Sequence, residues 1–167
     1  MLIIADSSAL IALATCQGLD VLLKLYNDVK VPQAVYDEVA SPQKPLATTL
    51  ASFLTGRIET VNMTNLILAV GDLGQGEIEA MALYKQLSAD ALLIDDRRAR
   101  LIAEYNQIYC IGALGVLLQA KQQKMIERVT PFVEKLRVSS IYYGDALLSK
   151  VLELAGEKPL SYYESAR

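Results

Sequence analysis

Two short stretches decide the fold: LIIAD at residues 2–6 and ALLIDD at residues 91–96. In each, four apolar residues run directly into aspartate, which is Asp6 in the first stretch and Asp95 and Asp96 in the second. Short apolar runs of this length are typical of strands buried on both faces of a parallel sheet. Because open α/β sheets place ligands beyond the carboxyl ends of their strands, we expect both sets of carboxylates at a ligand site.

The composition excludes several classes of catalytic and metal site. With 167 residues, 53% of them hydrophobic and 21% charged, the chain is expected to form one globular domain with a core. It contains no histidine, which excludes Ser-His-Asp and Cys-His nucleophile systems and histidine-ligated zinc. The two cysteines, Cys16 and Cys110, are too few for a four-cysteine zinc site and are expected to be buried free thiols.

The charge and hydropathy patterns bear on partners and location. The net charge of −3 argues against a large basic surface for nucleic acid, although it leaves room for a local basic patch. No apolar stretch approaches the roughly 20 residues that a membrane span needs, and no basic region precedes the first apolar run. We therefore expect a cytoplasmic protein without a membrane segment.

Strands and helices are predicted to alternate along the chain, which favours an α/β fold with a mostly parallel sheet and right-handed crossovers. Strands are predicted at residues 2–5, 58–63, 91–94 and 108–111, and residues 28–32 are predicted to be a short connector. Helices are predicted over residues 8–26 with a break near 18, and over 33–40, 46–54, 77–87, 97–105, 112–120, part of 125–136, and 142–155. Residues 156–167 are predicted to be a loose tail.

Further acids lie on predicted helices. Glu38 falls in the helix over 33–40, and Glu77 opens the helix over 77–87 after a glycine-rich loop that lets this helix begin close to the sheet. Carboxylates grouped together repel one another, and Mg²⁺ or Mn²⁺ offsets this repulsion because both ions prefer oxygen ligands. Such an ion activates water near neutral pH, and Arg97 and Arg98 are candidates for phosphate contacts.

Each of these residues also has a purely structural interpretation. Asp6 and the Asp95–Asp96 pair are suitable helix N-caps, and Glu77 suits the positive end of a helix dipole. Glu38 and the arginines at 97 and 98 suit solvated helix faces. The sequence leaves these interpretations open beside the metal cleft.

The sequence resembles the PIN-domain family of metal-dependent ribonucleases, which includes the VapC-type toxins. The resemblance rests on IADSSALI at residues 4–11, VPQAVYDE at 31–38, GQGEIEAMAL at 74–83, LLIDD at 92–96 and the glycine at 112. It covers roughly residues 1–123 and is closer to a PIN-like branch of predicted nucleic-acid-binding proteins than to the best-known toxins.

The resemblance implies a three-layer α/β/α sandwich over residues 1–137, with residues 138–167 as a C-terminal helical extension and tail. It also implies cleavage of single-stranded RNA by metal-activated water, with Mg²⁺ or Mn²⁺ as cofactor. A small antitoxin protein and a homodimer are the implied partners. The residues carried over are Asp6, Glu38, Glu77, Asp95 and Asp96 as catalytic acids, Asp6, Glu77 and Asp95 as metal ligands, and Ser7 as a substrate-binding residue beside Arg97 and Arg98.

Two other functions stay open at this point. One is a binding module that keeps the fold and holds RNA or a protein without cleaving it. The other is a receiver-like phosphoryl-transfer protein, which also places aspartate at strand ends. The second fits less well because the acidic pair follows the later strand, at 95–96, and no Asp-x-Asp motif follows the first strand.

Overall fold

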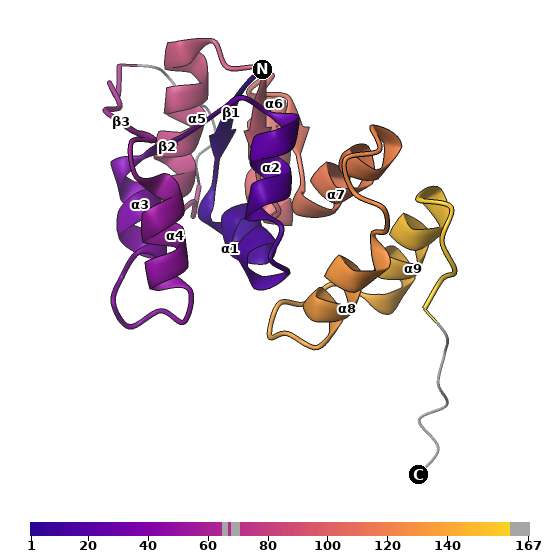
Figure 1. Cartoon of the computed structure of the whole chain (residues 1–167). Coiled ribbons are helices and arrows are strands. Elements are labelled where there is room, and N and C mark those ends of the chain that lie inside the picture. The colour runs from indigo at the N-terminus through magenta and orange to yellow at the C-terminus, as the bar shows by residue number, and fades with distance from the viewer. Residues whose placement is uncertain (65–66, 68–70, 161–167) are drawn as a thin grey trace.

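The computed structural model describes residues 1–64, 67 and 71–160, and its centre is a parallel β-sheet (Figure 1). The sheet has five strands in the order β3-β2-β1-β4-β5, and every neighbouring pair is parallel. This confirms the predicted α/β fold with a parallel sheet. The strands are β1 (Leu2–Ala5), β2 (Asp28–Pro32), β3 (Ile58–Glu59), β4 (Ala91–Leu93) and β5 (Cys110–Ile111).

The two apolar stretches form adjacent central strands. Ile3 of β1 pairs with Val29 of β2 on one side and with Ala91 of β4 on the other, and all three side chains are fully buried. Parallel strands covered on both faces read as continuous apolar runs, which is why these stretches could be recognised.

The prediction of a connector at residues 28–32 was wrong, because this segment is strand β2. Val29 and Val31 are fully buried and alternate with the half-buried Lys30, whose ammonium pairs with Glu59 of β3 at 3.0 Å. With only five residues, this alternation was too short to be distinguished from a connector. The predicted edge strand at 58–63 is real but only two residues long.

Helices cover both faces of the sheet, and nine are present in the described part of the chain. Helix α5 packs on β1, β2 and β4, whereas α1, α2 and α7 pack on one another, and β1 lies between α5 and α2 in Figure 1. The helices are α1 (Ser7–Thr15), α2 (Leu19–Leu25), α3 (Gln33–Val39), α4 (Ala47–Leu54), α5 (Gln75–Leu87), α6 (Arg97–Tyr105), α7 (Ala113–Gln122), α8 (Thr130–Arg137) and α9 (Asp145–Leu154). This arrangement is the α/β sandwich that the sequence predicted.

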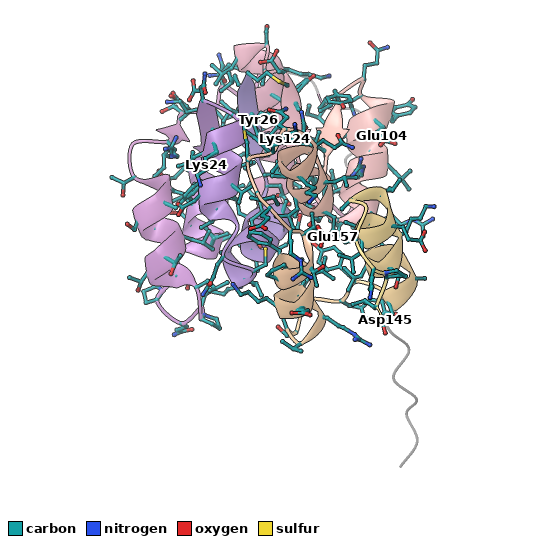
Figure 2. All side chains as sticks on the ribbon, turned by 45° about the vertical axis from the view of Figure 1, so that its right-hand side comes forward. Lys24, Tyr26, Glu104, Lys124, Asp145 and Glu157 are labelled. Atoms are coloured by element: carbon teal, nitrogen blue, oxygen red, sulfur yellow. The ribbon has the colours of Figure 1, made fainter. Side chains whose placement is uncertain are left out.

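Side chains tie the helices of one layer together. Tyr26, which follows α2, is only 2% exposed, and its hydroxyl donates to Gln119 of α7 at 2.8 Å (Figure 2).

Cys16 and Cys110 are buried free thiols, as predicted, and burial raises the pKa of each to about 11. Within the described residues, no single helix is both long and apolar enough to cross a membrane, and the bent pair α1 and α2 meets these criteria only when taken together.

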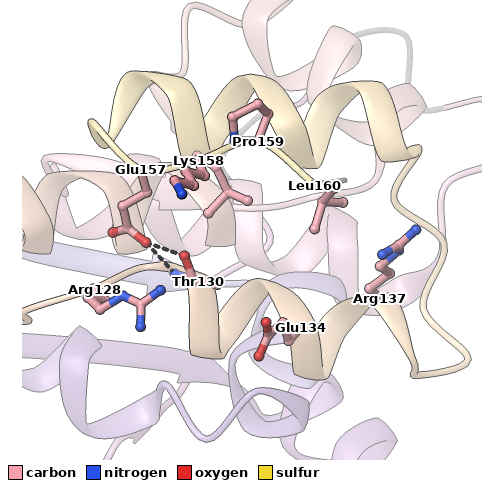
Figure 3. A pocket seen from close by; sticks show the side chains of 9 residues that line it. Arg128, Thr130, Glu134, Arg137, Glu157, Lys158, Pro159 and Leu160 are labelled. Carbon is pink, nitrogen blue, oxygen red and sulfur yellow. Dashed lines mark hydrogen bonds between the residues drawn. The ribbon is translucent and has the colours of Figure 1, made fainter. Parts of the chain in front are cut away.

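The described part of the predicted tail, residues 156–160, is not loose. The carboxylate of Glu157 accepts hydrogen bonds from the backbone N–H groups of Val129 at 2.6 Å and Thr130 at 2.8 Å, and from the Thr130 hydroxyl (Figure 3). Glu157 therefore satisfies N–H groups at the beginning of α8, which an α-helix leaves unpaired. Residues 161–167 of the predicted tail lie outside the described residues.

The strand order sets the position of a functional site. From β1 the chain first adds β2 and β3 on one side, and it later places β4 and β5 on the other side. The order therefore reverses between β1 and β4, and ligands of open α/β sheets bind in the crevice at such a switch point. Asp6 follows β1, and Asp95 and Asp96 follow β4, so the ends of both stretches lie at this crevice, which Asp6 and Asp96 line.

Candidate active site

A cleft of about 500 Å³ opens beyond the carboxyl ends of the strands. It is built by the beginning of α1, by α3, by the loop and first turn of α5, and by the residue that precedes α6. Four of the five predicted catalytic acids line it, and Asp95 does not. The wall consists of Asp6, Ser7, Ser8, Ile11, Ala34, Glu38, Gly74, Gln75, Gly76, Glu77 and Asp96.

Asp6 is the most buried acid of the cleft, with 2% of its surface exposed. Its Oδ2 caps α1 by accepting from the backbone N–H of Ser8 at 3.1 Å and from the Ser8 hydroxyl at 2.7 Å. Its Oδ1 is buried and has no hydrogen-bond partner among the described residues. Burial raises the pKa of Asp6. The capping interpretation is therefore correct for one oxygen, and it leaves the other unsatisfied.

Ser8 connects the two strand ends. Its hydroxyl donates to Asp6 and accepts from the backbone N–H groups of Asp95 at 3.0 Å and Asp96 at 3.3 Å. One side chain thus fixes the residues after β1 relative to those after β4. The sequence prediction did not include Ser8, whose only signal was its place next to Ser7.

Glu38 reaches the cleft from α3, whose Val35 and Val39 are buried in the core. The hydroxyl of Ser7 donates to Glu38 Oε2 at 2.8 Å. Ser7 is 5% exposed, so this bond holds the Glu38 carboxylate beside the beginning of α1. A direct role of Ser7 in substrate binding stays a prediction.

Glu77 lies in the first turn of α5, which begins two residues earlier than the sequence indicated. Its Oε2 accepts from the backbone N–H of Gly74 at 2.8 Å, which is one half of a capping box. Burial raises the pKa of Glu77, and the negative charges of Asp6, Asp96 and Glu38 add to this shift. These four carboxylates are therefore close enough to interact electrostatically.

A glycine lets α5 approach α3 closely, a contact that was not predicted. A Cβ at Gly76 would lie 3.3 Å from Val35 Cγ2 and 3.2 Å from Glu38 Oε2. Any larger residue would have to push α3 and the Glu38 carboxylate away from Glu77.

The two adjacent aspartates after β4 diverge. Asp96 caps α6 by accepting from the Ala99 N–H at 2.8 Å, and it lines the cleft. Asp95 instead accepts from the Ala113 N–H at 2.9 Å and from the Tyr143 hydroxyl at 2.5 Å. Burial and the negative charge of Asp95 raise the pKa of Tyr143. Both oxygens of Asp95 are thus engaged away from Asp6 and Glu77, and its metal-binding role stays a prediction.

Tyr143 was not among the predicted site residues, because it comes from residues 138–144, the segment between α8 and α9, which carries no motif. The two arginines predicted to contact phosphate lie outside the cleft wall. Arg97 and Arg98 are exposed, and the Arg98 guanidinium pairs with the Asp72 carboxylate at 2.6 Å. Within the described ranges, neither arginine contributes to the wall of the cleft.

The cleft has the donor chemistry for a hard divalent cation. All of its ionisable ligands are carboxylates, and Asp6 Oδ1 is a buried oxygen whose need for a partner a cation would meet. In the described part of the chain, however, no three acidic or cysteine side chains lie in positions that hold one ion as they stand. The residues therefore fit Mg²⁺ or Mn²⁺ chemically, and binding requires Glu38, Glu77 or Asp96 to reorient.

A second hollow, of about 700 Å³, lies between α8 and the segment after α9 (Figure 3). It contains Arg128, Arg137 and Lys158, but the N–H groups at the beginning of α8 are already taken by Glu157. None of the four cleft acids lines it, so it is not the candidate active site.

Comparison with known proteins agrees with this architecture. A family model described as a PIN domain, DUF3368, matches residues 2–157, which is more than half of the chain and includes α8 and α9. No curated protein and no solved structure is significantly similar to the chain. PIN domains are generally nucleases and typically use divalent metals. The parallel sheet, the acidic crevice at its switch point and the family match show that this chain belongs to the PIN-domain family.

Proposed function

We propose that the chain is a metal-dependent endoribonuclease that cleaves single-stranded RNA in the acidic cleft. The observation that carries this proposal is Asp6 Oδ1, a buried carboxylate oxygen with no partner in the described residues. An unpaired buried charge destabilises the folded protein, and a bound cation would offset this cost. The cleft beside it holds three further carboxylates, so the site is acidic enough to recruit that cation.

The cleft residues divide into ligands and positioning groups. Asp6, Glu77 and Asp96 would hold the cation, with Glu38 beside them. In this proposal Asp96 takes the place predicted for Asp95, whose two oxygens accept from Ala113 and Tyr143. Ser7 orients Glu38, and Ser8 fixes Asp6 relative to the residues after β4. When bound, Mg²⁺ or Mn²⁺ supplies a water of lowered pKa and stabilises negative charge on the phosphoryl group.

The charge of the cleft also defines how substrate binds. Four carboxylates repel a phosphodiester backbone, and the whole chain carries a net charge of −3. RNA affinity at this site should therefore depend on the divalent cation. Gly74 and Gly76 contribute no side chains to the α5 side of the cleft, which Gln75 and Glu77 also line, and this leaves room for a backbone phosphate to come close.

The test is cleavage of end-labelled single-stranded RNA in Mg²⁺ or Mn²⁺ and in chelator. We expect cleavage by the wild type with cation and a loss of roughly 100-fold or more in Asp6→Asn. Asp37→Asn is the matched control, because Asp37 is an exposed acid on α3 that bonds Gln33 and lies outside the cleft. Equal cleavage by Asp6→Asn and the wild type would exclude the mechanism.

The second candidate is a binding module without cleavage. It is favoured by the absence of a preformed three-ligand cation site in the described residues. It predicts RNA binding that is unchanged by chelator and no cleavage with any divalent cation. The antitoxin, the homodimer and the cytoplasmic location stay predictions.

A further inference from the structure

A third cavity, of about 340 Å³, shares Ile11 of α1 with the wall of the acidic cleft. Most of its remaining wall is apolar, with Leu46 and Leu50 from the α4 side and Ile141 from the segment between α8 and α9. Its polar wall includes Lys44 and Ser140. Nothing in the proposed cleavage reaction uses this cavity.

We propose that this cavity is a base-binding subsite, which receives one base of the single-stranded RNA whose phosphate lies in the acidic cleft. The inference rests on the proposed function, because it needs a strand in that cleft. It adds that cleavage depends on the base beside the cut, and that residues 138–144 contribute to this preference.

The size and chemistry of the cavity suit a base. Small-ligand sites occupy about 300–1,000 Å³ and combine apolar walls with a few polar groups that fix orientation. The apolar side chains would cover the faces of a base, and unstacked bases are read through hydrogen bonds to their edges. Among the described residues, neither the Lys44 ammonium nor the Ser140 hydroxyl has a hydrogen-bond or ion-pair partner, so Ser140 is available to a base edge and Lys44 to a phosphate.

The segment that closes the cavity is held in place from both sides. The Ser139 hydroxyl donates to the Leu136 carbonyl at 2.7 Å and accepts from the Ile141 N–H at 3.1 Å. Two residues after Ile141, the Tyr143 hydroxyl donates to Asp95. The wall formed by Ser140 and Ile141 is therefore tied to the end of β4, beside the cleft.

A base is a better occupant than a protein segment for two reasons. The cavity shares Ile11 in its wall with a cleft suited to phosphate and a cation, and Lys44 in its wall complements a phosphate. In addition, Tyr142, next to Ile141 in the chain, is 93% exposed, and exposed aromatic rings are stacking platforms for successive bases.

The experiment compares Ile141→Trp, which fills the cavity, with Val138→Ala, a matched control in the same segment that is 86% exposed and outside the wall. Cleavage of single-stranded RNAs that differ only at the base beside the cut is measured with each protein. We expect Ile141→Trp to raise KM about tenfold, to leave kcat within about twofold and to abolish the base preference. Leu46→Phe, which fills the cavity from the opposite wall, replaces Ile141→Trp if that variant does not fold.

A binding assay separates this inference from the proposed nuclease activity. The affinity of the wild type for a labelled RNA and for the same strand lacking one base is measured by fluorescence anisotropy in Mg²⁺. Weaker binding of the strand that lacks the base, with the difference removed by Ile141→Trp, supports the subsite even if no RNA is cut. Equal affinities of the wild type for the two strands, or an unchanged base preference in Ile141→Trp, would overturn it.

Discussion

Replacing the most buried acid of the cleft is expected to stabilise the metal-free protein. In Asp6→Asn, the side-chain oxygen still accepts from the Ser8 N–H, since asparagine is as good an N-cap as aspartate. The substitution removes the negative charge that Oδ1 carries without a partner in the described residues, and with it the repulsion between Asp6 and Glu77. Loss of a functional carboxylate should therefore increase stability.

The size of the effect follows from the burial of this one group. An unsatisfied buried polar group costs about 1–3 kcal/mol, and more when it is charged, while the amide of asparagine keeps part of this cost. We expect Asp6→Asn to raise the free energy of unfolding by about 1–2 kcal/mol in chelator, which is a rise of roughly 2–8 °C in Tm for a chain of this size. A cation at 100 times its Kd stabilises the wild type by about 2.7 kcal/mol, so saturating Mn²⁺ should reverse the order of the two proteins.

The difference should also depend on pH. Burial raises the pKa of Asp6 in the folded protein, so between its unfolded and folded pKa values the folded chain binds more protons than the unfolded chain. The free energy of unfolding then falls as pH rises through this window. The advantage of Asp6→Asn is therefore fully present above the folded pKa and shrinks as the pH is lowered through it.

Urea unfolding of wild type, Asp6→Asn and Asp37→Asn checks this prediction, in chelator and in Mn²⁺ at several pH values. Asp37 is exposed, so its variant should follow the wild type in every condition. An Asp6→Asn protein less stable than the wild type in chelator would refute the reasoning that Asp6 is a strained, unpaired charge.

Three further substitutions test the surroundings of the cleft. Gly112→Ala places a Cβ 2.8 Å from Asp95 Oδ1, and we expect a loss of about 1–3 kcal/mol in urea unfolding; an unchanged midpoint would show that Asp95 moves freely. Tyr143→Phe leaves one oxygen of Asp95 without its donor and should cost about 1–2 kcal/mol, with faster amide exchange in residues 138–144. Glu157→Gln removes the charged partner of the Thr130 N–H and hydroxyl and should lower the free energy of unfolding by about 1–2 kcal/mol near pH 7. These hydrogen bonds lower the pKa of Glu157 despite its burial, so the difference between the two proteins should disappear as the pH falls through that pKa.

The strands that the sequence revealed are those whose neighbours cover both faces. The run at 2–5 and the run at 91–94 are apolar throughout, so their burial could be inferred without knowing their partners. Strand β2 was missed because Lys30 points to Glu59, a residue that only the folded sheet brings near. Its pairing is a long-range property, and a five-residue window does not contain it.

The distinction between local and long-range features also holds for the candidate active site. Asp6, Glu38 and Glu77 were found because local rules, a strand end, a helix face and a glycine-rich turn, place them. Which of Asp95 and Asp96 faces the cleft could not be predicted, because Tyr143, 48 residues further along the chain, decides it. Three of the four cleft acids, Asp6, Glu77 and Asp96, also bond N–H groups at the beginning of a helix through one carboxylate oxygen, which leaves their other oxygen for the proposed functional role.

The most direct test of the central claim is a Mn²⁺ titration followed by electron paramagnetic resonance, with RNA cleavage measured on the same samples. Wild type and Asp37→Asn should bind Mn²⁺ with the same affinity and cut single-stranded RNA over the same concentration range. Asp6→Asn should lose both properties while remaining folded. Undiminished Mn²⁺ binding by Asp6→Asn would contradict the claim that the unpaired oxygen of Asp6 holds the cation.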